Sequence, residues 1–308
     1  MTYSVVITTY NGASFIQEQL ESIRMQTLSP YEVLIFDDGS QDNTVSLIND
    51  YIRLHDLTWR LVINETKLDW MGNYMQGLGK ATGDFLFLCD QDDIWMPERC
   101  EKMLSVMESQ RSCDVLMTNF KLLYTGTCKS VYKQLHAEGN SGRIRKIPCN
   151  KINLLSVMRP GCSYCVRRSF FQTVQDCWYE DVSHDRLLYT LSLLRDSLFL
   201  FEYQSLQFRQ HRYNNTPVLL RTRESRTDHV CYLLTFFQSV RQWMETHSFG
   251  YTPEGSCSLQ VLEDFCSARK AFFDAPSLFA WVVLVMKYHA SYPTMKKMVG
   301  DLWVGVFT

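Results

Sequence analysis

The sequence predicts an α/β fold, with a mostly parallel central sheet that carries helices on both faces and a helical region at the C-terminal end. Three observations predict it. The first ninety residues alternate β-branched runs with segments of helical periodicity, polar turns follow the strand runs, and only helical spacing continues after about residue 216. We therefore expect an α/β domain over residues 1–216 and a helical region over residues 217–308.

Strand and helix patterns follow one another along the first domain. Apolar and β-branched runs predict strands at Tyr3–Thr9, Glu32–Phe36, Trp59–Ile63 and Phe85–Cys89. Helical spacing predicts helices over 13–26, through Val45, Ile48 and Ile52, and near 71–81. The second of these helices is expected to have Ser40 or Asp42 as its N-cap. Further helices are predicted at Val230–Trp243, Glu254–Phe273 and Leu278–Tyr288.

The composition indicates a globular protein. The 308 residues are 46% apolar and 21% charged, enough to bury a sizeable core. Lys+Arg 31 against Asp+Glu 33 gives a formal charge of −2, which argues against broad nucleic-acid binding. The run MTYSVVITTYNG lacks the features of a secretory signal, and the longest apolar run, Leu278 to Met286, has nine residues against the roughly 20 that cross a bilayer. We expect a cytoplasmic protein.

The cysteines favour buried thiols over a disulfide framework. There are 11 of them, an odd number, scattered through apolar surroundings. The close pair Cys162 and Cys165 lacks the second CxxC of a four-ligand zinc site, so packing is favoured over metal or redox chemistry.

Acidic turns follow two of the predicted strands. The second strand ends in Asp37-Asp38-Gly39-Ser40 and the fourth in Asp90-Gln91-Asp92-Asp93. Because ligands of such sheets bind beyond the carboxyl ends of the strands, these carboxylates are expected to gather at one edge. DDGS alone is equally well explained as an ordinary turn. DQDD places three acidic side chains within four residues, and they repel one another unless a cation neutralises them.

Oxygen ligands without a nearby Cys or His favour a hard ion such as Mg²⁺ or Mn²⁺ over a solvated acidic turn. Such an ion, held by one or two carboxylates, implies a nucleoside diphosphate compound as the ligand. The chain has neither the GxxxxGK[ST] loop nor the GxGxxG fingerprint. A P-loop kinase and an NAD enzyme are therefore excluded, and the ion would carry most of the diphosphate charge.

Three ordered motifs, VVITTYNG, FDDGSQDNT and TGDFLFLCDQDDIWMPE, resemble those of the inverting family 2 glycosyltransferases of the GT-A (Rossmann-like) fold. The DQDDIW form resembles bacterial rhamnosyltransferases of surface polysaccharide synthesis, and GCSYCVRRS, SHDRLLY and FRQHRYNNT fit the same subgroup. The resemblance covers roughly residues 3–216. It implies transfer of a sugar from a dTDP- or UDP-sugar, with dTDP-rhamnose as the leading donor, to a saccharide or lipid-linked saccharide hydroxyl, with Mn²⁺ or Mg²⁺ as cofactor.

The resemblance also implies a role for particular residues. Nucleotide binding falls on Thr8, Tyr10, Asp38 and Asp90, and metal binding on Asp92, Asp90 and His211. The general base that removes the proton of the acceptor hydroxyl falls on Asp185. Contacts to the donor sugar or the acceptor fall on Asp93, Trp95 and His184. One departure is Leu68-Asp69-Trp70, where relatives commonly have a glycine turn; Asp tolerates left-handed geometry, so the turn is expected to survive.

Each of these roles has an ordinary structural alternative. Asp185 is a plausible helix N-cap, and His184 is equally well a buried structural histidine. His211 could be one solvated histidine of a surface loop, whose arginines would instead hold phosphate. Trp95 could be a core residue. A nucleotidyltransferase and a non-catalytic nucleotide-sugar binding module remain alternatives for the whole chain.

The last stretch mixes apolar and basic residues. Phe279, Trp281 and Val285 are accompanied by Lys287, Lys296 and Lys297. Peripheral contact with a membrane near a lipid-linked acceptor and packing on the first domain explain this mixture equally well.

Overall fold

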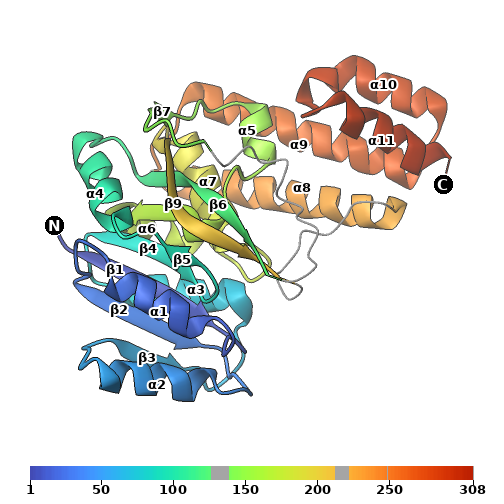
Figure 1. The fold of residues 1–308 in the computed structure, drawn as a ribbon. Coiled ribbons are helices and arrows are strands. Elements are labelled where there is room, and N and C mark those ends of the chain that lie inside the picture. Colours follow the sequence, from blue (N-terminus) through green and yellow to red (C-terminus); the bar gives the residue numbers. More distant parts are fainter. Residues whose placement is uncertain (126–138, 212–221, 248, 308) are drawn as a thin grey trace. The chain divides into compact units, whose positions relative to one another are not determined.

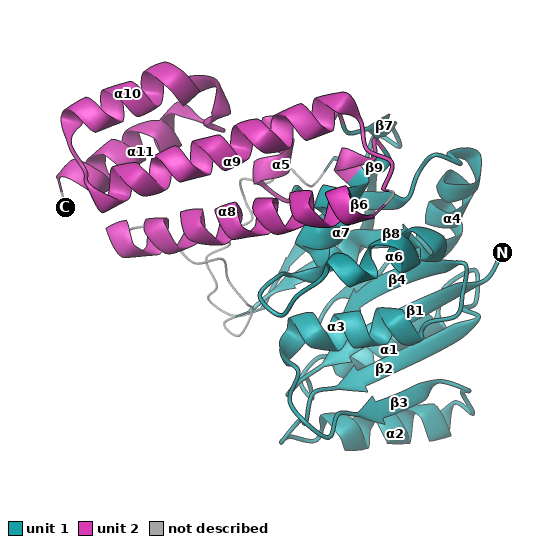
Figure 2. Ribbon diagram, turned by 180° about the vertical axis from the view of Figure 1, so that it is seen from behind, with its two compact units in different colours: residues 1–147, 158–192, 197–214 teal, residues 148–157, 193–196, 215–308 magenta. Residues whose placement is uncertain are grey.

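The computed structural model describes residues 1–125, 139–211, 222–247 and 249–307 (Figure 1). The chain forms two compact units (Figure 2). Unit 1 comprises residues 1–147, 158–192 and 197–214, and unit 2 comprises residues 148–157, 193–196 and 215–308. The sequence pattern did not predict that the two short segments 148–157 and 193–196 belong with the helical region. The predicted boundary at 216 lies outside the described residues.

In the part of the chain that the structure describes, unit 1 is built on a nine-stranded sheet of order β3-β2-β1-β4-β8-β6-β9-β5, with β7 paired to β9. The strands are β1 Tyr3–Thr9, β2 Glu32–Asp37, β3 Arg60–Ile63, β4 Phe85–Asp90, β5 Ile94–Trp95, β6 Val115–Tyr124, β7 Ile144–Lys146, β8 Tyr164–Arg167 and β9 Leu198–Gln210. The first four are mutually parallel, as predicted. The other half is mixed, because β8 runs antiparallel to both β4 and β6 while β6 and β9 are parallel.

Helices cover both faces of the sheet (Figure 1). They are α1 Ile16–Arg24, α2 Thr44–Leu54, α3 Asp69–Lys80, α4 Arg99–Ser109, α6 Arg168–Val174 and α7 His184–Leu194, with the short 3₁₀ turns η2 Gly161–Ser163 and η3 Gln175–Cys177. Buried residues of α1, α2 and α4 share one core with Val5, Ile7 and Phe87. α3 packs on the opposite face, where a Cβ on Gly77 would lie 2.5 Å from Val6. The strands are therefore buried on both sides, which explains their continuous apolar runs.

Two local details refine the predictions for unit 1. The N-cap position of α2 is Asn43, so neither Ser40 nor Asp42 takes it; instead Asp42 Oδ1 accepts a hydrogen bond from the Thr44 N–H at 3.0 Å. Asp69 has φ +57°, so the left-handed turn expected there is confirmed.

Unit 2 is helical. Its helices are α5 Lys151–Leu155, α8 Arg223–Thr246, α9 Pro253–Asp274, α10 Leu278–Tyr288 and α11 Met295–Val306, with the 3₁₀ turn η4 His289–Ser291. The four long helices begin at hydroxyl N-caps: Thr222, Thr252, Ser277 and Thr294. Within the described ranges, no helix combines the length and the apolar character that crossing a membrane requires.

Candidate active site

The polar turns of unit 1 begin at one edge of the sheet. In the parallel register, Thr8 of β1 is aligned with Asp90 of β4 on one side and with Phe36 of β2 on the other, so Asp37 is aligned with Thr9. The loops after these three strands therefore leave the sheet at the same level (Figure 1). This geometry collects the predicted residues from three separate stretches of the sequence.

Asp37 shapes the first acidic turn. The side chain is fully buried, and its Oδ1 accepts the N–H groups of Gly39 at 3.1 Å and Ser40 at 2.8 Å. Its Oδ2 accepts the hydroxyls of Thr9 at 2.7 Å and Ser40 at 2.6 Å. Gly39 has φ +81°, a conformation that favours glycine. Both oxygens of Asp37 are thus engaged in holding the turn. Asp38 is the carboxylate of the motif that remains for other contacts.

Asp38 ties this turn to the segment after β3. Its Oδ1 accepts the Asn64 amide at 3.0 Å and the Leu68 N–H at 2.8 Å. The ammonium group of Lys67 in this segment lies 4.0 Å from the centre of the Tyr10 ring. Tyr10 is 41% exposed, and its backbone exchanges two hydrogen bonds with the Gln91 side chain, at 2.9 and 3.0 Å. Tyr10 thus contacts both Lys67 and Gln91, and Asp38 contacts the segment that contains Lys67. Thr8 is buried in the adjoining strand β1.

The DQDD loop holds Asp90 and Asp92 in different ways. Asp90 Oδ1 accepts the phenol of Tyr74 at 2.7 Å. Burial, with the Asp92 carboxylate as the next cause, raises the pKa of Asp90 to about 6. Asp92 Oδ2 lies 2.7 Å from His211 Nε2, just beyond the end of β9. Asp92 thus contacts His211 and acts electrostatically on Asp90, the two other residues for which the resemblance implied metal binding. His211 is a partner of Asp92 rather than a solvated loop histidine.

Arg209 fixes the position of this loop. Its Nε donates to the Asp92 carbonyl oxygen at 2.7 Å, and its Nη2 donates to Glu18 of α1. The guanidinium also lies over the Phe15 ring, which in turn stacks on His211 at 4.6 Å. Arg209 is therefore committed to protein contacts and does not hold phosphate in this arrangement; the neighbouring Arg212 lies outside the described residues.

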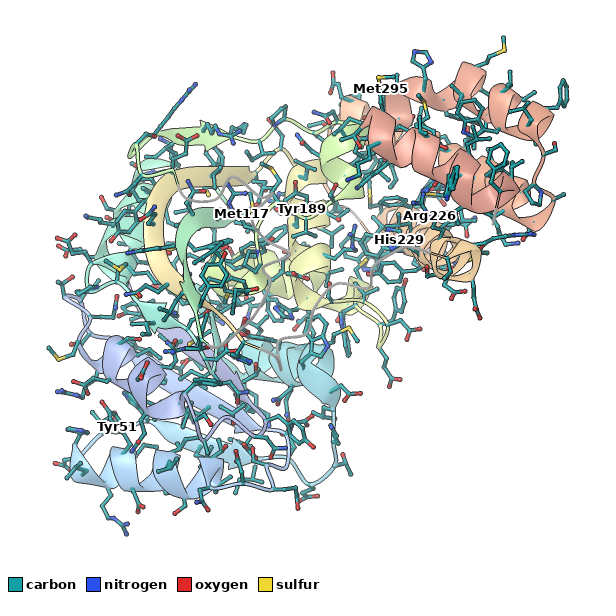
Figure 3. The ribbon with its side chains drawn as sticks, turned by 45° about the vertical axis from the view of Figure 1, so that its right-hand side comes forward. Tyr51, Met117, Tyr189, Arg226, His229 and Met295 are labelled. Atoms are coloured by element: carbon teal, nitrogen blue, oxygen red, sulfur yellow. The ribbon has the colours of Figure 1, made fainter. Side chains whose placement is uncertain are left out.

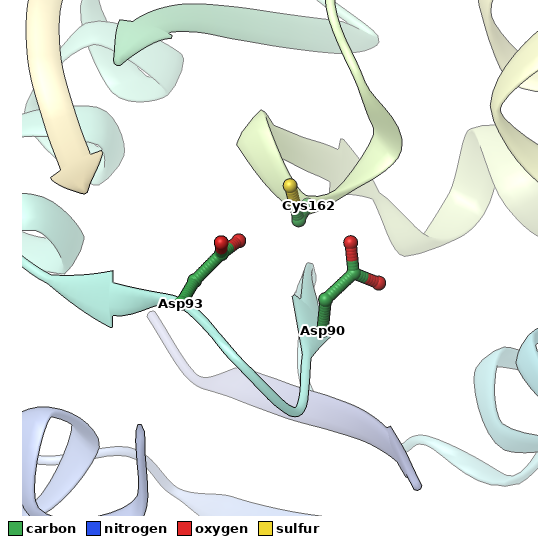
Figure 4. Close-up of side chains that lie close together, drawn as sticks. All are labelled: Asp90, Asp93 and Cys162. Carbon is green, nitrogen blue, oxygen red and sulfur yellow. The ribbon is translucent and has the colours of Figure 1, made fainter. Parts of the chain in front are cut away.

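Asp93 turns inward. It is fully buried, its Oδ1 accepts the Arg209 N–H at 3.0 Å, and its Oδ2 has no hydrogen-bond partner among the described residues. Ligand atoms of Asp93, Asp90 and Cys162 lie within 4.8 Å of one another (Figure 4). Burial raises the pKa of Asp93 well above its ordinary value and does the same for the Cys162 thiol. The predicted contact between Asp93 and a sugar does not fit this burial.

Trp95 also differs from its predicted role as a sugar contact. Only 2% of the residue is exposed, and its ring packs against Phe87 of β4 with the Arg99 guanidinium 4.3 Å from its centre. Such burial leaves no ring face for a sugar, so Trp95 is a core residue.

Asp185 lies in the first turn of α7, close enough to Asp90 to act on it electrostatically. Its carboxylate is among the causes that raise the pKa of Asp90. Its Cβ is 3.2 Å from the position that a Cβ on Gly161 would take, next to Cys162. The Asp185 Oδ1 accepts the Arg186 N–H at 2.7 Å, and α7 begins at His184. Asp185 therefore lies inside the helix rather than at its N-cap, with its carboxylate close to the acidic loop.

His184 is buried between aromatic rings. Its ring centre is 4.0 Å from that of Tyr74 and 5.6 Å from that of Trp70. A Cβ on Gly161 would lie 2.5 Å from His184 Nε2, so glycine is required for this close approach. His184 thus packs behind Tyr74, which supports the structural role that the sequence left open for it.

His184 makes the stability of the fold depend on pH. Burial lowers its pKa from 6.5 to about 4. Between these values the unfolded chain takes up a proton that the folded chain does not, so stability is lost as pH falls from 6.5 towards 4, by about 3 kcal/mol in total. We expect His184→Gln to remove this part of the pH dependence in urea unfolding curves, whereas His289→Gln, at an exposed position, keeps it. Equal pH dependence of the wild type and His184→Gln would contradict the assignment.

The residues present fit a hard divalent ion. Asp90 and Asp92 offer carboxylate oxygens, His211 offers an imidazole nitrogen, and the carboxylates repel one another without a cation. The buried Asp93 Oδ2, which has no hydrogen-bond partner within the described ranges, is a further oxygen close to Asp90. Cys162 fits less well, because its buried thiol stays protonated and sulfur is a soft ligand.

Several site residues were missed from the sequence. Tyr74 lies within the apolar pattern of α3, and Glu18 and Asn64 resemble ordinary surface residues. Nothing in their local sequence signals a role, because each contact depends on how a helix or loop packs on the sheet edge.

Comparison with known proteins identifies the family of the chain. Residues 4–172, more than half of the chain, match the glycosyl transferase family 2 domain. The amylovoran biosynthesis glycosyltransferase AmsB of Erwinia amylovora is 33% identical over 109 residues, 35% of this chain and 36% of AmsB. The putative glycosyltransferase EpsE of Bacillus subtilis is 30% identical over 115 residues, 37% of this chain and 41% of EpsE. The matched regions thus span about a third to two-fifths of these curated relatives.

Solved structures show the same fold. The S. aureus TarS 1-349 structure in complex with UDP has a TM-score of 0.61 at 15% identity, covering 99% of this chain and 90% of that one. The mannosyltransferase PcManGT from Pyrobaculum calidifontis, in complex with GDP-Man and Mn²⁺, has a TM-score of 0.56 at 16% identity, covering 99% and 86%. The fold is that of the GT-A glycosyltransferases, and the match over residues 4–172 shows that the chain belongs to glycosyltransferase family 2.

Proposed function

We propose that this chain is an inverting, metal-dependent glycosyltransferase that moves a sugar from a nucleotide-sugar donor to a hydroxyl of a glycan or lipid-linked saccharide. The observation that carries the proposal is the convergence of the DQDD loop with His211 and Asp185, three segments far apart in the sequence. Family membership favours sugar transfer over nucleotidyl transfer.

The proposed donor site lies over the ends of β1 and β2. Tyr10 offers an exposed aromatic ring on which a base could stack, and Lys67 beside it offers a positive charge. Asp38 is fixed by Asn64 and the Leu68 N–H, so its carboxylate is preorganised for a hydrogen bond from a base or ribose. Thr8, buried beside them in β1, and Asp90 complete the proposed nucleotide contacts.

Asp90, Asp92 and His211 are the residues that would hold the proposed ion. When bound, a divalent ion neutralises charge on the diphosphate and so favours its departure. The chain's own contribution is orientation, because Tyr74 holds Asp90 and Arg209 fixes the backbone of Asp92.

The proposed base is Asp185. An alcohol is a weak nucleophile at neutral pH, and a positioned carboxylate that takes its proton typically accelerates attack by about 10²–10⁴-fold. Attack from the face opposite the leaving diphosphate inverts the anomeric centre. The reaction then requires no covalent link between sugar and protein.

The finer specificity rests on resemblance. The DQDDIW motif points to dTDP-rhamnose as the donor, while the neighbouring structures hold UDP, UDP-GlcNAc or GDP-Man. A UDP-sugar is therefore the other donor to test. We propose that the enzyme acts in the cytoplasm, where nucleotide sugars are made.

Thermal unfolding with a panel of nucleotide sugars tests the donor assignment. A ligand at 100 times its Kd stabilises the fold by roughly 2.7 kcal/mol. We expect dTDP-rhamnose with Mn²⁺ to raise the melting temperature more than either component alone. A panel that includes UDP- and GDP-sugars and produces no Mn²⁺-dependent shift would contradict a nucleotide-sugar site.

A further inference from the structure

Unit 2 exposes large apolar side chains on its last two helices. Phe279 and Met286 of α10 are 78% and 77% exposed, and Val282 and Val283 lie between them at helical spacing. On α11 the exposed side chains fall four residues apart, at Met295, Val299 and Trp303. We name these seven residues the α10–α11 face. Figure 3 marks Met295 at the start of α11.

The opposite sides of these helices hold unit 2 together. Tyr288 of α10 is buried against Phe265 of α9, and Trp281 Nε1 donates to the Met298 carbonyl at 3.2 Å. Asp301 of α11 is fully buried, where it accepts hydrogen bonds from Arg226 at 2.6 Å and Arg269 at 2.8 Å. The α10–α11 face is thus an outer surface, and its side chains can be changed without disturbing these contacts.

The charges of α10 and α11 that reach the surface are basic, and the exposed Asp264 of the neighbouring α9 interacts electrostatically with Lys287. Between residues 275 and 307 the Asp, Glu, Lys and Arg residues are Lys287, Lys296, Lys297 and Asp301. Asp301 is buried and paired with two arginines, whereas the three lysines are exposed. Large apolar side chains bordered by lysines are the chemistry that binds an anionic lipid surface.

The same charges argue against a second copy as the occupant. Two copies that met through the α10–α11 face would bring their lysines towards one another, and like charges across an interface are unfavourable. A bilayer offers acyl chains to the apolar side chains and phosphates to the lysines.

We propose that α10 and α11 bind the surface of an anionic lipid bilayer through the α10–α11 face. The apolar side chains enter the boundary between headgroups and acyl chains, and Lys287 and Lys296 contact the headgroup phosphates. Trp303 suits this depth, because tryptophan favours the membrane–water interface. The proposal rests on unit 2 alone, so its failure would leave the proposed sugar transfer untouched.

Flotation of the full chain with lipid vesicles tests the proposal. We expect binding to vesicles of phosphatidylglycerol and phosphatidylcholine, weaker binding to phosphatidylcholine alone, and a decrease with salt. Lys287→Gln with Lys296→Gln should weaken binding about 25-fold, at about fivefold for each lysine. Phe279→Ser with Met286→Ser should weaken it at least about tenfold.

Matched controls come from unit 1. Leu54→Ser removes an apolar side chain that is 77% exposed on α2, and Lys121→Gln removes an exposed lysine from β6. Both should bind vesicles as the wild type does. The proposal is overturned if the chain does not bind anionic vesicles at low salt, or if it binds neutral vesicles equally well. It is overturned as well if Phe279→Ser with Met286→Ser binds anionic vesicles as strongly as the wild type does. It is also overturned if light scattering shows a dimer that Phe279→Ser with Met286→Ser dissociates, because the face would then belong to a second copy.

Discussion

Replacing Asp185 with asparagine is expected to lower the rate of sugar transfer by about 10²–10⁴-fold while the donor still binds. Asparagine keeps the shape of the side chain and an oxygen that can accept the Arg186 N–H, so the start of α7 should survive. It cannot take a proton from the acceptor hydroxyl. We therefore expect kcat to fall, whereas the Mn²⁺-dependent thermal shift with donor stays at the wild-type value.

The control for this variant is Asp181→Asn, four residues earlier in an exposed loop. It carries the same chemical change and should transfer sugar at the wild-type rate. Retained turnover in Asp185→Asn would show that another group is the base. Loss of the donor-induced shift would instead give Asp185 a role in donor binding.

The first half of the sheet could be predicted because its pattern is local. Strands β1, β2 and β4 are buried on both faces, so each is a continuous apolar run that ends in a polar turn. The second half could not. One of its pairings joins Val115 of β6 to Leu198 of β9, across more than eighty residues. Nothing in either segment indicates which distant strand will be its partner.

The site, like the sheet, could be predicted only in part from the sequence. The DQDD motif located the acidic loop, but it could not show which aspartate turns inward. The Arg209 N–H of β9 binds Asp93, and the His211 imidazole just beyond that strand contacts Asp92, so a distant strand decides the orientation of both. Tyr74 reaches Asp90 only because α3 packs on the sheet as it does.

Replacing Asp92 with asparagine is expected to lower sugar transfer by at least about 10³-fold and to abolish the Mn²⁺-dependent thermal shift with donor. The carboxylate at this position supplies negative charge beside His211, and an amide oxygen is a much weaker ligand for a hard divalent ion. The amide can still contact the imidazole, so the fold should persist. Asp56→Asn, an exposed aspartate in a left-handed turn that asparagine also tolerates, is the control for the chemical change.

The neighbouring Asp93 provides a sharper comparison within the same loop. Burial raises its pKa and so disfavours the charged carboxylate, and asparagine imitates the uncharged form while still accepting the Arg209 N–H. We therefore expect Asp93→Asn to keep the Mn²⁺-dependent shift that Asp92→Asn loses. The opposite pattern, with the shift lost in Asp93→Asn and kept in Asp92→Asn, would mean that the ion binds among Asp90, Asp93 and Cys162, in which case its charge would keep Asp93 ionised.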